Sequence, residues 1–117
     1  MADKIDIYQE ERPWGSFRRF TNNIPSTVKI ISIKPNEELS RQSHDERSEF
    51  WHVTLGSGQC LIDNDKYELH KGDEKFVPIK ALHKIIAGAE GIEILEISLG
   101  DFDEGDITRY EDKYGRL

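Results

Sequence analysis

The sequence predicts an all-β protein of a single domain, built as a sandwich or small barrel with few or no helices. Its apolar runs are short and rich in β-branched residues, and Gly, Pro, Asn and Asp interrupt them about every 8–12 residues. No window longer than about ten residues keeps the 3.6-residue period of an amphipathic helix. The chain has 117 residues, which is enough for one hydrophobic core and one domain.

The first predicted strands lie in the first half of the chain. Thr27–Ile33 is rich in β-branched residues and stops at the turn signal Pro35-Asn36. Glu49–Leu55 follows and is closed by Gly56-Ser57-Gly58, after which Gln59–Asp63 begins the next strand. We therefore expect separate short strands here, divided by the two glycines.

The remaining predicted strands follow the same pattern. Lys66–His70 pairs with the preceding strand through a tight hairpin turn at Asn64-Asp65. Glu74–Val77 is halted by Pro78. His83–Ala87 and Ile92–Leu99 enclose a segment with two glycines, which predicts another hairpin turn at 88–91.

The ends of the chain complete the domain. We expect one domain over residues 1–117, with 1–11 as an N-terminal extension. Residues 100–117 are acidic but carry Phe102, Tyr110 and Tyr114, so this segment is predicted to pack on the barrel. Trp14 and Trp51 are expected in the core, with shielding of a pocket as the alternative.

The charge balance limits the classes of partner. Sixteen basic and 23 acidic residues give a net charge of −7, which argues against nucleic-acid binding but leaves a phosphorylated metabolite open. The sequence shows no signal peptide and no run near the roughly 20 apolar residues of a membrane-spanning helix. The single cysteine, Cys60, cannot form an intramolecular disulfide and is expected as a buried apolar residue. A cytoplasmic protein that does not contact the membrane is the expectation.

Four polar side chains have the character of metal ligands. Gln42 and His44 are two residues apart and project from one face of a strand, Glu49 opens the next apolar run, and His83 begins a later one. Two imidazoles, a carboxylate and an amide oxygen suit one divalent ion of Zn, Mn, Fe, Co or Ni. Four such ligands would leave two positions of a six-coordinate ion for substrate oxygens. Histidines in the core or at the surface without a metal remain the alternative.

The spacing of these residues resembles the two-part signature of the cupin superfamily. Its first part corresponds to Gln42-x-His44, Glu49 and Gly56, and its second part to Gly72, Pro78 and His83. Asn36 and Lys80 stand where the signature has glycines, Gln42 replaces its first histidine and Ala87 its closing asparagine. The resemblance implies a double-stranded β-helix, or jelly-roll barrel.

A narrower resemblance, to the cupin domain of type II phosphomannose isomerases, covers about residues 12 to 116. It rests on motifs spread along the chain: Arg12-Pro13-Trp14-Gly15, Lys34-Pro35, Leu39-Ser40-x-Gln42-x-His44-x-x-Arg47-x-Glu49-x-Trp51, Phe76-Val77-Pro78, and Asp106-Ile107-x-Arg109-x-Glu111-Asp112-x-Tyr114-Gly115-Arg116. The family commonly has a histidine where Glu46 stands. Glu46 is therefore open to three interpretations: a further ligand, a repelling charge at the rim, or a residue that faces solvent.

The resemblance implies an isomerase that interconverts mannose 6-phosphate and fructose 6-phosphate through a cis-enediol. The divalent ion would be held by Gln42, His44, Glu49 and His83. Arg109 is the candidate for a catalytic and substrate-binding role, and the further candidates for binding the phosphate are Arg116, Arg12 and Lys34.

The base that transfers the proton is left open among three acids, and the family resemblance adds a C-terminal arginine as a further candidate. Glu96, Asp101 and Glu111 can each point inward, and the sequence does not rank them. His52 is out of phase with Glu49 and Trp51 on its strand, so it is expected to face away from the metal.

Two alternative functions and a homodimer are also considered. A non-catalytic cupin that binds a sugar phosphate or nucleotide sugar is the first alternative, and an oxygenase is the second, because one fold hosts many chemistries. A homodimer is expected, since small barrels of this kind often pair their edge strands.

Overall fold

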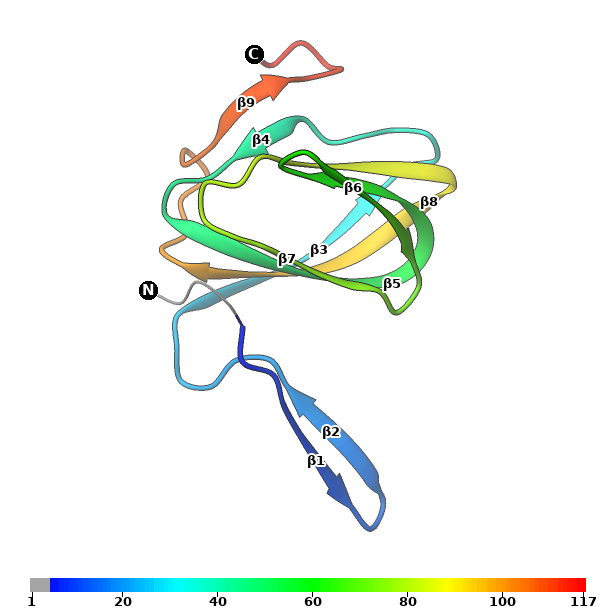
Figure 1. Ribbon diagram of the computed structural model, residues 1–117, viewed down its shortest axis with the longest axis vertical. Coiled ribbons are helices and arrows are strands. Elements are labelled where there is room, and N and C mark those ends of the chain that lie inside the picture. Colours follow the sequence, from blue (N-terminus) through cyan, green and yellow to red (C-terminus); the bar gives the residue numbers. More distant parts are fainter. Residues whose placement is uncertain (1–4) are drawn as a thin grey trace.

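A computed structural model describes residues 5–117, and these residues form strands but no helix (Figure 1). The first four residues of the expected N-terminal extension lie outside the described residues. The strands are β1 (Tyr8–Arg12), β2 (Gly15–Arg19), β3 (Ser26–Ile33), β4 (Arg41–Ser43), β5 (Arg47–Ile62), β6 (Asp65–His70), β7 (Glu74–Val77), β8 (His83–Gly100) and β9 (Thr108–Glu111). With no helix between residues 5 and 117, that part of the chain has none able to span a bilayer. The all-β prediction is confirmed.

Two long strands organise the domain. β5 and β8 run antiparallel along most of their lengths, and the seven-stranded sheet has the order β6-β5-β8-β4-β9. β3 pairs with β8 and β7 pairs with β5, and the sheet curves into an open barrel (Figure 1). β9 pairs with β4, so the C-terminal segment lies against the barrel.

Strands β1 and β2 form a separate hairpin, here called the arm, which projects from the barrel (Figure 1). Its turn is Pro13-Trp14, and Trp14 is 73% exposed, so the expectation that Trp14 lies in the core or shields a pocket is wrong. A two-residue turn at the tip of a free hairpin gives the indole nothing to pack against. Arg18 ties the arm to the barrel through two hydrogen bonds of 2.9 and 2.8 Å to Glu74.

The core lies inside the curved sheet and follows the two-residue alternation of its strands. On β5 the side chains of Trp51 and Val53 point inward and are 1% exposed, and on β8 those of Ile85 and Ile94 meet them. A second cluster lies on the outer face, where Phe50, Ile97 and Leu99 are covered by other apolar side chains, those of Ile5, Ile7, Phe20 and Phe76. The inner face thus supplies both the core and the walls of the site described below.

Of the two predicted hairpin turns, one is confirmed and one is wrong. The hairpin between β5 and β6 is confirmed, although its turn is Asp63-Asn64, with Asp63 at a φ of 52°. The predicted hairpin at 88–91 is wrong, because β8 continues through it, and β5 likewise continues through 56–58 with a shift of register. These glycines allow two backbones to approach rather than a chain reversal: a Cβ at Gly58 would lie 2.2 Å from the carbonyl oxygen of Ile86.

Two residues at glycine positions of the cupin signature adopt left-handed backbone angles. Asn36 has a φ of 62° and Lys80 a φ of 69°. Asparagine enters this region readily, whereas lysine is strained there. The backbone of the signature is therefore kept at both turns without its glycines.

Cys60 is predicted to be unreactive in the folded protein. Its side chain is 0% exposed, and burial raises the pKa of the thiol to about 11. At pH 8 about one thiol in a thousand would then be ionised, against about a quarter for a free cysteine with its pKa near 8.5. A thiol reagent should react with Cys60 only after denaturant is added. Reaction at the rate of a free thiol in native buffer would contradict this placement.

Candidate metal centre

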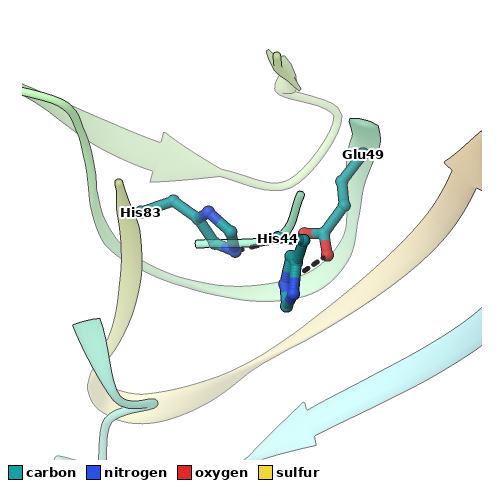
Figure 2. A group of neighbouring side chains, drawn as sticks. All are labelled: His44, Glu49 and His83. Atoms are coloured by element: carbon teal, nitrogen blue, oxygen red, sulfur yellow. Dashed lines mark ion pairs between the residues drawn. The ribbon is translucent and has the colours of Figure 1, made fainter. Parts of the chain in front are cut away.

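Three buried side chains converge inside the barrel: His44, Glu49 and His83 (Figure 2). Each offers a ligand atom, and the three atoms lie within 4.8 Å of one another. The topology brings them together, because Gln42 of β4 pairs with His83 at the start of β8 and Glu49 pairs with Ser98 near the end of β8. Residues far apart in the sequence therefore meet on one inner face.

Both imidazole rings are held in the same tautomer by backbone carbonyls. Nδ1 of His44 lies 2.7 Å from the carbonyl oxygen of Asp106, and Nδ1 of His83 lies 3.1 Å from that of Ala81. A carbonyl oxygen only accepts, so each Nδ1 carries a hydrogen, and Nε2 of each ring points inward. Such outer contacts are the usual way in which proteins orient histidine ligands.

Glu49 is the acceptor at the centre of the cluster. Its carboxylate lies 3.1 Å from Nε2 of His44 and 3.6 Å from Nε2 of His83, and the indole of Trp51 donates to it at 3.0 Å. Burial alone would raise the pKa of Glu49, but the His44 contact and the neighbouring imidazoles lower it to about 2. Burial also lowers the pKa of His83, which favours the neutral ring.

The donor set fits a divalent cation. The carboxylate of Glu49 and the Nε2 atoms of two imidazoles point toward one another in a site where each residue is at most 4% exposed. Buried groups of this kind are stable when a cation lies between them. The nitrogen and oxygen donors suit Zn or a first-row transition ion, and the identity of the ion is not fixed by them.

Gln42, the fourth predicted ligand, lines the same cavity. Its amide nitrogen donates to the hydroxyl and carbonyl oxygens of Ser40 at 3.0 and 3.3 Å. The amide oxygen is then the atom that Gln42 can offer to an ion. Glu46, by contrast, is exposed and takes no part in the cluster, which favours the solvent-facing interpretation of this residue.

The cavity beside the cluster has a volume of about 190 Å³ and a mixed charge. Its basic residues outnumber its acidic ones: Lys29, Arg47, Lys84, Arg109 and Arg116 against Glu49, Glu96 and Glu104. The protein as a whole has the opposite balance, with a net charge of −7. A local excess of guanidinium and ammonium groups in an acidic protein suits an anionic ligand.

Two of the four predicted phosphate-binding residues reach this cavity. Arg109 lines it, and its Nε is buried without a hydrogen-bond partner in the described part of the chain. Arg116 lines it as well but is held by Asp112 through contacts of 2.9 and 2.7 Å. Arg12 lies on the arm and pairs with Glu10, and Lys34 lines a different hollow, so neither is brought to the cluster.

Arg47 is a site residue that the sequence analysis did not select. Its guanidinium is 5% exposed and lies beside the cluster, with Nε 3.7 Å from Glu49 and Nη2 3.4 Å from His44. Nη1 donates to the carbonyl oxygen of Asp103 at 3.0 Å, and the ring of Phe102 lies under the group at 4.4 Å. Its position two residues before Glu49 was the available signal, because alternation places both side chains on one face.

Among the three acids left open, the structure brings Glu96 to the cavity. Glu96 is 5% exposed, and burial, together with the nearby Glu49, raises its pKa to about 7. Asp101 is exposed, and the side chain of Glu111 is 61% exposed near Arg41. His52 points outward to Glu74 at 2.7 Å, which confirms that it faces away from the cluster.

Comparison with known proteins matches the chain to one family. Residues 3–112 match the family described as "Mannose-6-phosphate isomerase C-terminal". The alginate biosynthesis protein AlgA of Pseudomonas syringae is 37% identical over 114 residues, which are 96% of this chain and 23% of that protein. A mannose-1-phosphate guanylyltransferase of Escherichia coli is 33% identical over 108 residues, 91% of this chain and 23% of that protein. The chain thus spans about a quarter of the length of these relatives.

A solved structure supports the fold. A cupin protein from Bacteroides fragilis superposes with a TM-score of 0.60 at 24% identity, covering 73% of this chain and 71% of that one. The superposition shows that the two chains share a fold. The chain has a cupin fold and belongs to the mannose-6-phosphate isomerase C-terminal family.

Proposed function

We propose that this domain is a metal-dependent sugar-phosphate isomerase that interconverts mannose 6-phosphate and fructose 6-phosphate. The observation that carries the proposal is the His44–Glu49–His83 cluster at the wall of a cavity rich in arginine and lysine. Membership of the mannose-6-phosphate isomerase C-terminal family supports the choice of substrate. Aldose–ketose isomerisation needs the two kinds of group that this cavity combines, a charge-stabilising centre and an anchor for phosphate.

One divalent ion would be held by His44, Glu49 and His83, with the amide oxygen of Gln42 as a fourth ligand. Bound there, it would supply Lewis-acid stabilisation for the negative charge that develops on the sugar oxygens. Carbonyl contacts keep both rings in place before the ion binds, so little ordering is left for the binding step.

The chain's own residues would orient the substrate and handle the proton. Arg109 lines the cavity, has a buried Nε without a hydrogen-bond partner in residues 5–117 and would anchor the phosphate, with Arg116 as a further basic group in the lining. Proton transfer between C1 and C2 requires a group within hydrogen-bonding reach of both carbons. Of the three acids considered, Glu96 alone lines the cavity, and Trp51 and Ile31 close part of its wall against water.

The test is isomerisation of mannose 6-phosphate by purified protein, freed of metal and then reloaded with Zn, Mn, Co, Fe or Ni. A coupled assay follows fructose 6-phosphate, and turnover of about 1 s⁻¹ or more would lie in the usual enzyme range. Metal-dependent turnover is the expected result. No turnover with any ion that binds would overturn the proposal.

A second candidate is a domain that binds a sugar phosphate or nucleotide sugar without converting it. It is favoured by the relatives, which are about four times the length of this chain and include a mannose-1-phosphate guanylyltransferase. Calorimetry with mannose 6-phosphate and with a nucleotide sugar separates the two functions. Affinity without product would identify the binding domain, and oxygen consumption would indicate an oxygenase instead.

Arg109→Ala should raise KM for mannose 6-phosphate about 10- to 100-fold, the range expected for a charge-assisted hydrogen bond. The phosphate does not react, so kcat should change less than KM. Steady-state kinetics check this, with Arg19→Ala as the control because Arg19 lies on the arm over the Tyr8 ring. An unchanged KM in the Arg109 variant would remove Arg109 from the phosphate site.

A further inference from the structure

Arg47 is a buried cation beside the cluster, and the proposed function has so far given it no role. It lines the cavity and is 5% exposed. Its Nη1 donates to the carbonyl oxygen of Asp103 at 3.0 Å, and its central carbon lies 4.4 Å from the centre of the Phe102 ring. Because removing a charged group from water is costly, a guanidinium held in this way indicates a negatively charged partner.

The edge of the guanidinium that carries Nε and Nη2 faces the ligand atoms of the cluster. Nε lies 3.7 Å from the carboxylate of Glu49, and Nη2 lies 3.4 Å from Nε2 of His44. Nε has no hydrogen-bond partner within residues 5–117, and 3.4 Å is long for a hydrogen bond. Nε2 of His44 has at most one lone pair, so it cannot accept from Arg47 and bind an ion at the same time. With the ion bound, both donors of this edge would be free for a ligand.

The other basic residues of the cavity have different surroundings. Three of them are paired with acids at 2.7 to 3.2 Å: Lys29 with Glu104, Lys84 with Glu38 and Arg116 with Asp112. The fourth, Arg109, is the candidate anchor for the phosphate. That phosphate is bonded to C6, at the opposite end of the substrate from the reacting carbons C1 and C2. Arg47, which contacts the cluster itself, is therefore placed for the reacting end.

Isomerisation puts negative charge on two neighbouring oxygens in turn. When a base takes the proton from C2 of mannose 6-phosphate, the C–H electron pair forms the C1–C2 double bond and the carbonyl pair moves to O1. The hydroxyl proton then passes from O2 to O1, and C1 is protonated as O2 becomes the carbonyl of fructose 6-phosphate. Fixed donors beside such a developing charge, in a site poor in water, lower the barrier because they need no reorganisation.

We propose that Arg47 is a catalytic residue whose Nε and Nη2 donate to O1 and O2 of the substrate and stabilise the enediolate charge. This role rests on the proposed isomerase function. It differs from that of Arg109, which would hold the phosphate from binding to release. An Arg47 variant should therefore lose stabilisation of the enediolate, whereas an Arg109 variant should lose affinity for every phosphorylated ligand.

The test compares two phosphorylated ligands by calorimetry on protein saturated with zinc. In 5-phosphoarabinonohydroxamate the paired oxygens imitate the charged enediolate, whereas mannitol 6-phosphate has neutral hydroxyl groups at C1 and C2. Arg47→Met should weaken binding of the hydroxamate about 100-fold and binding of mannitol 6-phosphate less than threefold. Arg47→Lys, which keeps the charge but has no two-donor edge, should weaken hydroxamate binding at least tenfold.

Arg41→Met is the matched control. Arg41 also has a buried Nε without a hydrogen-bond partner in the described part of the chain, but it lies 3.6 Å from Glu111 and does not line the cavity. Its variant should bind both ligands like the wild type. Equal losses for the two ligands in the Arg47 variants, or no loss, would overturn the proposal. Loss of zinc from these variants would also overturn it, by making Arg47 part of the metal centre instead.

Turnover separates this role from the isomerase function itself. Arg47→Met should lower kcat about 100- to 1000-fold with a smaller change in KM, the reverse of the Arg109 result. A wild type that converts mannose 6-phosphate, with an Arg47 variant of unchanged kcat, would overturn the role of Arg47 alone. A wild type without turnover would overturn the isomerase and this role together.

A second measurement needs no variant that must fold. The proton NMR signal of the Arg47 Nε–H group is followed in the zinc-loaded wild type as each ligand is added. The signal should move downfield with the hydroxamate, because Nε gains a charged acceptor, and should stay near its place with mannitol 6-phosphate. An unmoved signal at saturating hydroxamate would overturn the proposal.

Discussion

Glu49→Gln is expected to lower the affinity for the divalent ion about 100-fold or more, since loss of a ligand exceeds the effect of losing an outer contact. Isomerisation should then be lost at ordinary metal concentrations. Glutamine keeps nearly the shape of the side chain, but the carboxylate is the one charged member of the predicted ligand set. Without it the two inward Nε2 atoms have no anionic partner between them. Metal content is measured by mass spectrometry after dialysis against a buffered ion.

Matched histidine variants separate a metal effect from a general loss of structure. His83→Gln should behave like Glu49→Gln, whereas His52→Gln should keep its metal, because His52 faces Glu74 on the outer side of the same barrel. Metal at a concentration of 100 times its dissociation constant should also stabilise the wild type by about 2.7 kcal/mol, and its melting temperature should rise accordingly. Unchanged metal content in the Glu49 variant would mean that the ion is bound elsewhere.

Gly58→Ala is expected to destabilise the fold by about 3 kcal/mol or more, the upper end for overpacking. The added methyl group would lie 2.2 Å from the carbonyl oxygen of Ile86 and 3.2 Å from the Cα of Ala87. Both contacts are to backbone of β8, which cannot move without breaking the longest pairing in the sheet. The melting temperature should fall by about 10 °C or more.

Gly105→Ala is the control for this substitution. The nearest atom to its new methyl group belongs to the flexible side chain of Asp103, at 3.3 Å, and the change in stability should stay within about 0.5 kcal/mol. Urea denaturation of both variants gives the comparison. Equal stability of the Gly58 variant and the wild type would show that the two backbones are further apart than described.

The local pattern of the sequence predicted strand content better than strand length. Short predicted strands such as Thr27–Ile33 and Glu74–Val77 lie within or match observed strands. The glycines at 56–58 and 88–91 have the composition of turns, but they lie inside strands of 16 and 18 residues. A glycine that reverses the chain and a glycine that admits a neighbouring backbone look alike until the partner strand is known.

The candidate site was predictable where it depended on spacing and not where it depended on long-range contacts. The signature spacing selected His44, Glu49 and His83, which meet in the structure. Arg12 shares a motif with the family but lies on the arm, away from the cavity. Arg47 was missed because a single arginine in a charged stretch gives no sign of burial, which only its contacts with Phe102 and Asp103 reveal.

Asp106 links the far end of the chain to the cluster. Its carbonyl oxygen accepts from His44, and its carboxylate accepts from the backbone amides of Asp45 and Glu46 at 2.8 and 2.9 Å. The coupling free energy between two sites is the same in both directions. If the ordered C-terminal segment increases the affinity of the cluster for an ion, a bound ion therefore stabilises the ordered segment by the same free energy. The C-terminal segment is thereby coupled to the candidate metal centre. Removing the segment would lower the affinity of the cluster for an ion, and a bound ion would protect the segment from proteases.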